Sequence, residues 1–457
     1  MTTDNAATLS VNLEDRKELR KQVISIAWPA VTELVLASLF GAIDMIMVGG
    51  LGAAAIAAVG LTNQPLLLIM AVFQALNIGG TAIVARSIGS RNITVAQNTT
   101  KQLLLITALL SLLIIVPSVG FVKQIYVFMG AKEDVVLLGI KYFILVLWGV
   151  IFQNLSLTIA AVLRGTGDTK TPMKINVASN IANVIMNYIL IFGRFGMPQM
   201  GVTGAGLATF ISRGMAFTAL IAFMFLSRSP LKLSVKNLFS FDLSLTKRVL
   251  RIGFPSALEQ LVLRTGNLFF VKAVAGLGTV VYAAHQISIN ILSLSFTAGM
   301  AFGIAASVLI GQSLGAGKNK LAEEYGKEVR FLGILVSTAM GILIFIFAEE
   351  IIGLYTSDLD VIKNASMILK MIAFIQPFQA AQLILAGGLR GAGDTRWPLY
   401  STLVGIWGIR ISFAYIFINI MNIGLVGAWL GICIDQIIRY VILYLRYKTN
   451  KWQYVKV

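Results

Sequence analysis

The chain has 457 residues, of which 57% are hydrophobic and only 12% are charged, whereas roughly a quarter of the residues in a soluble domain are charged. This balance excludes an ordinary soluble protein and predicts an all-α membrane protein. A single cysteine and a single histidine exclude intrachain disulfides and multi-cysteine metal sites. They also leave none of the clustered His or Cys side chains expected of an intramembrane transferase, so we expect no enzyme, no catalytic residues and no organic cofactor.

Apolar stretches recur along the whole chain, and each is close to the about 20 residues that a helix needs to cross the hydrocarbon layer. We expect twelve spans, near residues 22–48, 54–84, 99–122, 138–162, 173–193, 201–226, 249–272, 279–308, 329–348, 365–388, 399–420 and 424–446. The polar start lacks the short apolar core and small-residue cleavage site of a secretory signal. We therefore expect residues 1–21 to remain as an N-terminal segment.

Lysine and arginine concentrate in the first segment and in every second connection. The basic positions there include Arg16, Lys17, Arg20, Lys21, Arg91, Lys101, Arg164, Lys170, Lys232, Lys236, Lys318, Lys320, Arg390, Arg396, Arg446 and Lys448. The alternate connections "GGLGA" and "GLGT" have no basic residue. This positive-inside pattern predicts a multi-pass protein of the plasma or inner membrane with both termini in the cytoplasm. Because topology accounts for the net charge of +17, we expect contact with membrane lipids and no nucleic-acid partner.

A glycine-rich phrase occurs twice, as "VLRGTGDTKTP" from Val162 and "GLRGAGDTRWP" from Gly388. The shift of 226 residues between the copies also pairs Pro29 with Pro255 and Glu33 with Glu259. The chain is therefore a tandem duplication. The glycines permit a tight turn and the aspartate can cap the next helix. A phosphate cradle is the alternative, but neither copy has the GxxxxGK[ST] pattern.

Each half holds six expected spans, so both halves begin on the same side of the membrane and form parallel repeats. The fold class is thus an all-α membrane protein with twelve transmembrane helices in two six-helix repeats around a central cavity. We expect five parts, which are a cytoplasmic segment 1–21, an N-lobe 22–226, a cytoplasmic linker 227–247, a C-lobe 248–446 and a cytoplasmic tail 447–457.

One carboxylate stands out in the first expected span. Asp44 follows Pro29 by fifteen positions, or about 22 Å of helix, which places it in the outer half of the membrane. A carboxylate at that depth is costly and functional by default. Pro29 removes a backbone hydrogen bond, so the helix that bears Asp44 can kink. The alternative is a structural carboxylate that neighbouring hydroxyls satisfy.

Asparagines form one face of the fifth span. Their spacings of four, three and four residues place them on the same side of a helix, at Asn176, Asn180, Asn183 and Asn187. Together with Asp44 and with Thr209 of the sixth span they offer hard oxygen ligands, which suit Na⁺. A carboxylate removed from water also suits a proton. The sequence therefore predicts an ion-coupling site of Asp44, Asn180, Asn183, Asn187 and Thr209.

The chain resembles the multidrug and toxic compound extrusion (MATE) family over nearly its whole length. The resemblance rests on the paired LRG-x-GD-T loops, the stretch "GQSLGAG", the first helix with Pro29 followed by "IDMIMVGGLG", and "GVTGAGLAT". It implies a two-lobed exporter of bulky, often cationic or amphipathic compounds, coupled to H⁺ or Na⁺. It also implies that Asp44, Asn183 and Thr209 belong to the ion-coupling pocket and are the candidate Na⁺ ligands.

The resemblance is incomplete at several functional positions. Many relatives have a second aspartate where this chain has Asn187, which puts a two-carboxylate proton relay in doubt. In some relatives functional acids occupy the positions of Leu263 and Gln379, so their second-half acidic site is not intact here. The shift of 226 places Phe270 opposite Asp44. We therefore expect ion coupling in the first half alone.

The second half carries charged residues of its own in the expected spans. Because buried charges of both signs normally pair, we expect a network of Glu259 with Arg410 and of Arg264 with Asp435. Contact of Glu259 or Asp435 with a cationic substrate is the alternative. The full set of candidates for this network or for the substrate cavity is Glu33, Gln64, Gln74, Asn77, Asn154, Glu259, Gln260, Arg264, Gln379, Arg410 and Asp435.

The leading hypothesis is a monomeric antiporter that exports small organic cations by alternating access between two lobes. A flippase for lipid-linked saccharides, built on a related helical plan, is the rival. It would favour a strongly basic cavity for pyrophosphate, and Arg264 and Arg410 are few for that role, although Arg86 and Arg213 keep it open.

Overall fold

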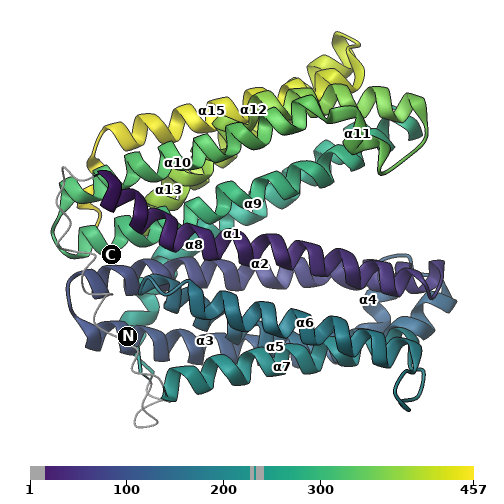
Figure 1. Ribbon diagram of the computed structural model, residues 1–457, viewed down its shortest axis with the longest axis horizontal. Helices are drawn as coiled ribbons and strands as arrows, with labels where there is room; N and C mark the ends of the chain where they lie inside the picture. Colours follow the sequence, from purple (N-terminus) through teal and green to yellow (C-terminus); the bar gives the residue numbers. More distant parts are fainter. Residues whose placement is uncertain (1–15, 227–230, 233–240) are drawn as a thin grey trace. The chain divides into compact units, whose positions relative to one another are not determined.

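The computed structural model describes residues 16–226, 231–232 and 241–457. The first fifteen residues of the expected N-terminal segment, and most of the expected linker with Lys236, lie outside this described part. Within it all regular structure is helical (Figure 1). The all-α prediction is therefore confirmed.

Eleven of the described helical segments are long and apolar enough to cross a membrane. They are α1 (Arg16–Gly49), α2 (Ala53–Gly89), α3 (Ile93–Gly120), α5 (Glu133–Gly165), α6 (Lys170–Phe192), α7 (Gly201–Leu226), α9 (Thr279–Gly315), α10 (Asn319–Ile346), α12 (Leu359–Gly391), the segment Arg396–Ile420 and α15 (Gly424–Lys448). The twelfth expected span is α8 (Leu243–Ala275), which is as long as its neighbours but carries Glu259, Arg264 and Lys272. Twelve helices account for the fold.

The duplication is visible in the helix bounds. The helices α2, α3, α4 (Val122–Phe128) and α5 begin 226 residues before α9, α10, α11 (Ala348–Gly353) and α12, respectively. In the first half α5 packs against α2, α3 and α7, and in the second half the equivalent α12 packs against α9, α10 and α15. Each half thus surrounds one central helix with the same neighbours.

The eleventh span differs from its counterpart α6. It is divided into α13 (Arg396–Thr402), the π-helical η2 (Leu403–Ile411), α14 (Ser412–Tyr415) and the π-helical η3 (Ile416–Ile420). Wide π-helical turns are rare and often occur at functional sites. The asparagine-bearing α6 is an uninterrupted α-helix.

The chain forms two compact units, and the division between them falls inside α1. Residues 32–250 belong to one unit, whereas Arg251–Val457 and α1 up to Val31 belong to the other. Within α1 this first unit thus begins at Thr32, whereas the expected N-lobe begins at residue 22, and the five expected parts stay a prediction. The reason for the difference is apolar packing, because Leu19, Val23 and Ile26 are buried in a core that α9, α10, α12 and α15 complete.

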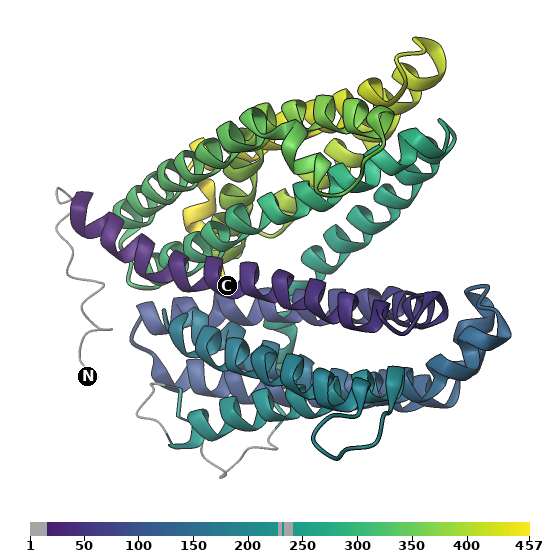
Figure 2. The same cartoon turned by 45° about the vertical axis from the view of Figure 1, so that its right-hand side comes forward.

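The start of α1 is also bound to its unit by polar contacts. Arg20 Nε lies 2.8 Å from Glu328 Oε2 of α10, and Tyr325 donates to Gln22. The helix α1, coloured purple in Figure 2, is one uninterrupted helix from Arg16 to Gly49. It changes units two residues after Pro29, where the proline ring removes one backbone hydrogen bond.

The helix α8 begins where the linker docks on α3. Asp242 accepts hydrogen bonds from the backbone N–H groups of Leu245 and Ser244, at 3.2 and 2.8 Å. These bonds, the one from Leu245 first, lower the pKa of the Asp242 carboxyl because they stabilise its charged form. Gln102 of α3 accepts from the Asp242 N–H and donates to Thr246, which fixes the first turn of α8.

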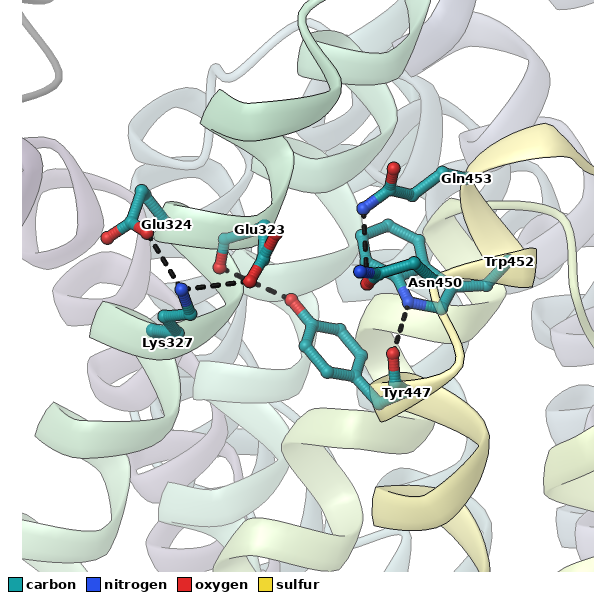
Figure 3. Close-up of polar contacts among 7 residues, drawn as sticks. All are labelled: Glu323, Glu324, Lys327, Tyr447, Asn450, Trp452 and Gln453. Carbon is teal, nitrogen blue, oxygen red and sulfur yellow. Dashed lines mark hydrogen bonds and ion pairs between the residues drawn. The ribbon is translucent and has the colours of Figure 1, made fainter.

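The expected C-terminal tail folds back onto its unit. Trp452 is fully buried, stacks on Tyr447 with ring centroids 4.7 Å apart and donates its indole N–H to the Tyr447 carbonyl. The Tyr447 hydroxyl donates to the Glu323 carbonyl of α10 (Figure 3). Beside it, Lys327 bridges Glu323 and Glu324. The tail is therefore an ordered part of the second unit.

Candidate functional site

The arginines of the two repeated phrases occupy equivalent ion pairs. Arg164, near the end of α5, lies 2.8 Å from Glu33 of α1, and Arg390, near the end of α12, lies 2.7 Å from Glu259 of α8. Both pairs span 131 residues. The expected pairing of Glu259 with Arg410 is therefore wrong, because the repeat places Arg390 nearer to Glu259.

A third residue completes each of these pairs. Asn176 donates to the same Glu33 oxygen at 2.6 Å, and Thr402 donates to the same Glu259 oxygen at 3.2 Å. Each second carboxylate oxygen, Oε2 of Glu33 and of Glu259, is buried without a hydrogen-bond partner. The two copies thus form the same three-residue cluster in each half of the chain.

The loops that follow these arginines differ in what their aspartates do. Gly167 and Gly393 have φ angles of 93° and 83°, values that glycine adopts without strain. Asp168 accepts from the Thr171 N–H at 3.0 Å and caps α6 as expected. Asp394 instead forms an ion pair with Arg446 of α15, at 2.7 Å.

Asp44 of α1 lies against the asparagine face of α6. Asn187 Nδ2 donates to Asp44 Oδ1 at 2.8 Å. When the Asn183 amide is oriented so that each of its atoms meets a compatible partner, its Nδ2 lies 3.1 Å from both Asp44 oxygens and its Oδ1 accepts from Ser212 at 3.2 Å. Amide orientation is assigned from such networks. The structure thus brings Asp44, Asn183 and Asn187 together, and it adds Ser212 of α7.

Two further predicted members of this site are placed differently. Thr209 contributes its backbone carbonyl, which accepts from the Ser212 hydroxyl at 3.1 Å. Asn180 is half-buried on α6 and makes no hydrogen bond with Asp44. Sequence reasoning missed Ser212, although it follows Thr209 by three positions and therefore shares a helix face with it.

No lysine or arginine nitrogen in the described residues lies within 4.0 Å of the Asp44 carboxylate. Arg213 of α7 donates to the Val146 carbonyl at 3.4 Å. Asp44 is therefore a half-buried carboxylate held by amides. Such a group can take up a cation.

The second half pairs its buried acid with an arginine. Asp435 of α15 is fully buried and accepts from Arg410 of η2, whose Nε lies 2.9 Å from Oδ2. Arg410 also donates to Asn267 of α8 at 3.0 Å. The expected pairing of Arg264 with Asp435 is wrong, since Arg264 is exposed. Arg264 follows Glu259 by five positions, which turns it to another face of α8.

The remaining candidates for the cavity or the network fall into two groups. Asn77 accepts from Thr158 at 2.9 Å and Asn154 donates to Ser111 at 3.2 Å, so both bind neighbouring helices together. The others make no side-chain hydrogen bond in the described part of the chain. Gln379 is buried, Gln260 is half-buried, and Gln64 and Gln74 are exposed.

Comparison with known proteins adds the family. The MatE family model matches residues 29–189 and 255–416, one match in each half of the chain. The "Probable multidrug resistance protein NorM" of Thermotoga maritima is 32% identical over 96% of this chain and 94% of its own length. The "Uncharacterized transporter YisQ" of Bacillus subtilis is 30% identical over 94% of each chain.

Solved structures share the fold. A multidrug resistance MATE family transporter of the MOP superfamily, in an outward-facing conformation, superimposes with a TM-score of 0.89 at 23% identity over 99% of both chains. A MOP superfamily transporter from Pyrococcus furiosus gives a TM-score of 0.89 at 23% identity over 98% of both chains. At this level of identity the likeness establishes the architecture.

Proposed function

The chain belongs to the MatE family of membrane transporters, and from that premise we propose that it exports small organic compounds, cationic or amphipathic, in exchange for H⁺ or Na⁺. The exporter works as a monomer in the plasma or inner membrane with both termini in the cytoplasm. The orientation follows from the excess of lysine and arginine in alternate connections.

The observation that carries the proposal is the Asp44 carboxylate, which has amide donors but no ion-pair partner among the described residues. A carboxylate in this environment favours a bound cation. Rotation of the Asn183 or Asn187 amide would present an oxygen, and the Thr209 carbonyl could supply another. Asp44, Asn183, Asn187 and Thr209 would then surround a small hard ion, and a proton could occupy the same carboxylate.

The exchange follows from competition at this carboxylate. Ion binding at Asp44 opposes binding of a cationic compound in the same unit, and binding of the compound promotes ion release. The helix that carries Asp44 changes units just after Pro29, so a bend there can couple occupancy of the site to movement. Alternating access then follows from the two-state rearrangement of the units.

The name of the Thermotoga maritima relative, a probable multidrug resistance protein, supports organic compounds as cargo. The saccharide flippase remains the weaker hypothesis, because Arg410 is committed to Asp435 and Arg264 lies outside the buried network. A pyrophosphate group needs several free basic groups.

The proposal is tested by efflux of a fluorescent organic cation from proteoliposomes that contain the full-length protein. A pH gradient and a sodium gradient are imposed separately. We expect one of the two gradients to drive efflux in the wild type and neither to do so in Asp44→Asn. Asp360→Asn, at an exposed acid in the first turn of α12, serves as the matched control. Full gradient-driven efflux by Asp44→Asn would refute the assignment.

A further inference from the structure

Arg439 of α15 is a buried arginine that has no carboxylate partner among the described residues. Arg439 is only 4% exposed. Within the described part of the chain its Nη2 donates to the Thr402 hydroxyl at 2.9 Å, and its Nε is buried without a partner. A guanidinium has five N–H donors in a planar fork. Most of the binding capacity of Arg439 is therefore unused by the protein.

The charges around Arg439 do not balance. Glu259 pairs with Arg390 and Asp435 pairs with Arg410, so each neighbouring carboxylate already has an arginine partner. After both pairs are formed, the positive charge of Arg439 remains. An uncompensated charge within a membrane-embedded helix bundle is energetically unfavourable. A bound anion would remove that cost.

A glycine, Gly405, leaves the space that the side chains of Asp435 and Arg439 occupy. Gly405 lies in the π-helical η2, and a Cβ atom there would overlap Asp435 Oδ1 and the Cγ and Cδ atoms of Arg439. The side chains of Asp435 and Arg439 thus pack directly against the backbone of Gly405. Gln436, three positions before Arg439, also has a buried Oε1 without a hydrogen-bond partner among the described residues. Several buried polar atoms near Arg439 therefore lack hydrogen bonds.

From the unpaired guanidinium, the charge imbalance and the glycine contact, we propose that Arg439 binds a monovalent anion. The neighbouring carboxylates of Glu259 and Asp435 would repel a doubly charged phosphate, whereas one negative charge neutralises the cluster. The planar fork of Arg439 matches a carboxylate or another small oxyanion. The anion is either the carboxylate of an exported zwitterionic compound, which rests on the proposed function, or a free inorganic ion.

Wild-type protein alone provides the first test. The affinity of the detergent-solubilised full-length chain is measured by fluorescence polarisation for a rhodamine with a free carboxylate and for its ethyl ester, each in gluconate and in nitrate buffer. A carboxylate subsite predicts about ten-fold tighter binding of the free acid, in line with one charged hydrogen-bonded pair, and competition by nitrate. A free-ion site predicts equal binding of both probes and a nitrate-dependent rise in melting temperature.

Variants then connect either effect to Arg439. We expect Arg439→Gln to abolish the preference for the free acid, or the nitrate effect, and to leave ester binding within about two-fold. Arg439→Lys keeps the charge but loses the planar fork, so it should retain part of the effect. Arg330→Gln is the matched control, because Arg330 stacks on Tyr444 in the same unit.

Two results would overturn the inference. One is a wild type that binds both probes equally and shows no response to nitrate, which needs no variant and so does not depend on the folding of Arg439→Gln. The other is an undiminished anion effect in Arg439→Gln. Gradient-driven efflux of the ester probe by the wild type is measured in parallel. If the wild type does not export this probe, the proposed export function is contradicted, whatever the result for the anion site.

Discussion

The two halves of the molecule share helices and one ion pair, yet Asp435 in the second half is paired with an arginine, whereas Asp44 in the first half has no ion-pair partner among the described residues. Glu33 with Arg164 and Glu259 with Arg390 are the same contact repeated. Beyond that contact the first half holds the carboxylate of Asp44 among amides. The duplicated scaffold thus supports two different polar interiors.

Buried charges that stabilise the scaffold differ from those that bind an ion in whether both halves keep them. A charge that both halves keep, with the same partner at the same spacing, stabilises the helix packing. The second half has Phe270 at the position equivalent to Asp44 and neutralises its own acid, Asp435, with Arg410. Removing a paired acid should therefore reduce stability, whereas removing the unpaired Asp44 should affect ion coupling.

Asp435→Asn should give the largest loss of stability. The substitution leaves Arg410 buried without its ion-pair partner, and breaking a buried ion pair from one side costs about 3–5 kcal/mol. Chemical unfolding in mixed micelles measures the free energy of unfolding. A loss below about 1 kcal/mol would show that the pair does not stabilise the second unit.

Glu33→Gln and Glu259→Gln should each cost about 1.5–3 kcal/mol, because each removes a charged hydrogen bond to one arginine. The repeat predicts equal losses for the two variants. Double-mutant cycles with Arg164→Gln and Arg390→Gln isolate the coupling energy of each pair. Clearly unequal coupling energies would mean that the two copies have different roles.

Some of these contacts could be predicted from the sequence and others could not. The twelve helices and the meeting of Asp44 with Asn183 and Asn187 follow from hydropathy and helical spacing. The predicted pairing of Glu259 with Arg410 is wrong, because the second half contains several arginines and only the fold shows that Arg390 is the one that contacts Glu259. The shift of 226 that pairs Arg164 with Arg390 was the available signal.

Other features could not be found from the sequence. Nothing in the residues around Leu403–Ile411 distinguishes a π-helix from an α-helix. Arg439 could not be selected from the sequence either, because only the structure shows that no carboxylate among the described residues pairs with it. The passage of α1 from one unit to the other depends on the burial of Leu19 and Val23 among helices that lie far away in sequence. Such tertiary packing leaves no periodic pattern.

Gly405→Ala should cost about 1–3 kcal/mol, because the added methyl group overlaps Asp435 and Arg439 and forces them apart. The position 226 residues earlier is Ser179, whose hydroxyl donates to the Ser212 carbonyl at 2.6 Å. Ser179→Ala should cost only about 0.5–1.5 kcal/mol. Equal losses in unfolding experiments would show that η2 adapts to the added methyl group.

Asp44→Asn should leave the free energy of unfolding within about 1 kcal/mol of the wild type, since asparagine can accept the same amide hydrogen bond. The decisive measurement on this variant is the affinity for a fluorescent organic cation at increasing concentrations of the coupling ion. Reciprocal linkage predicts that the ion weakens binding in the wild type and has no effect in Asp44→Asn. An equal response to the ion in both proteins would contradict the assignment of Asp44 as the coupling carboxylate.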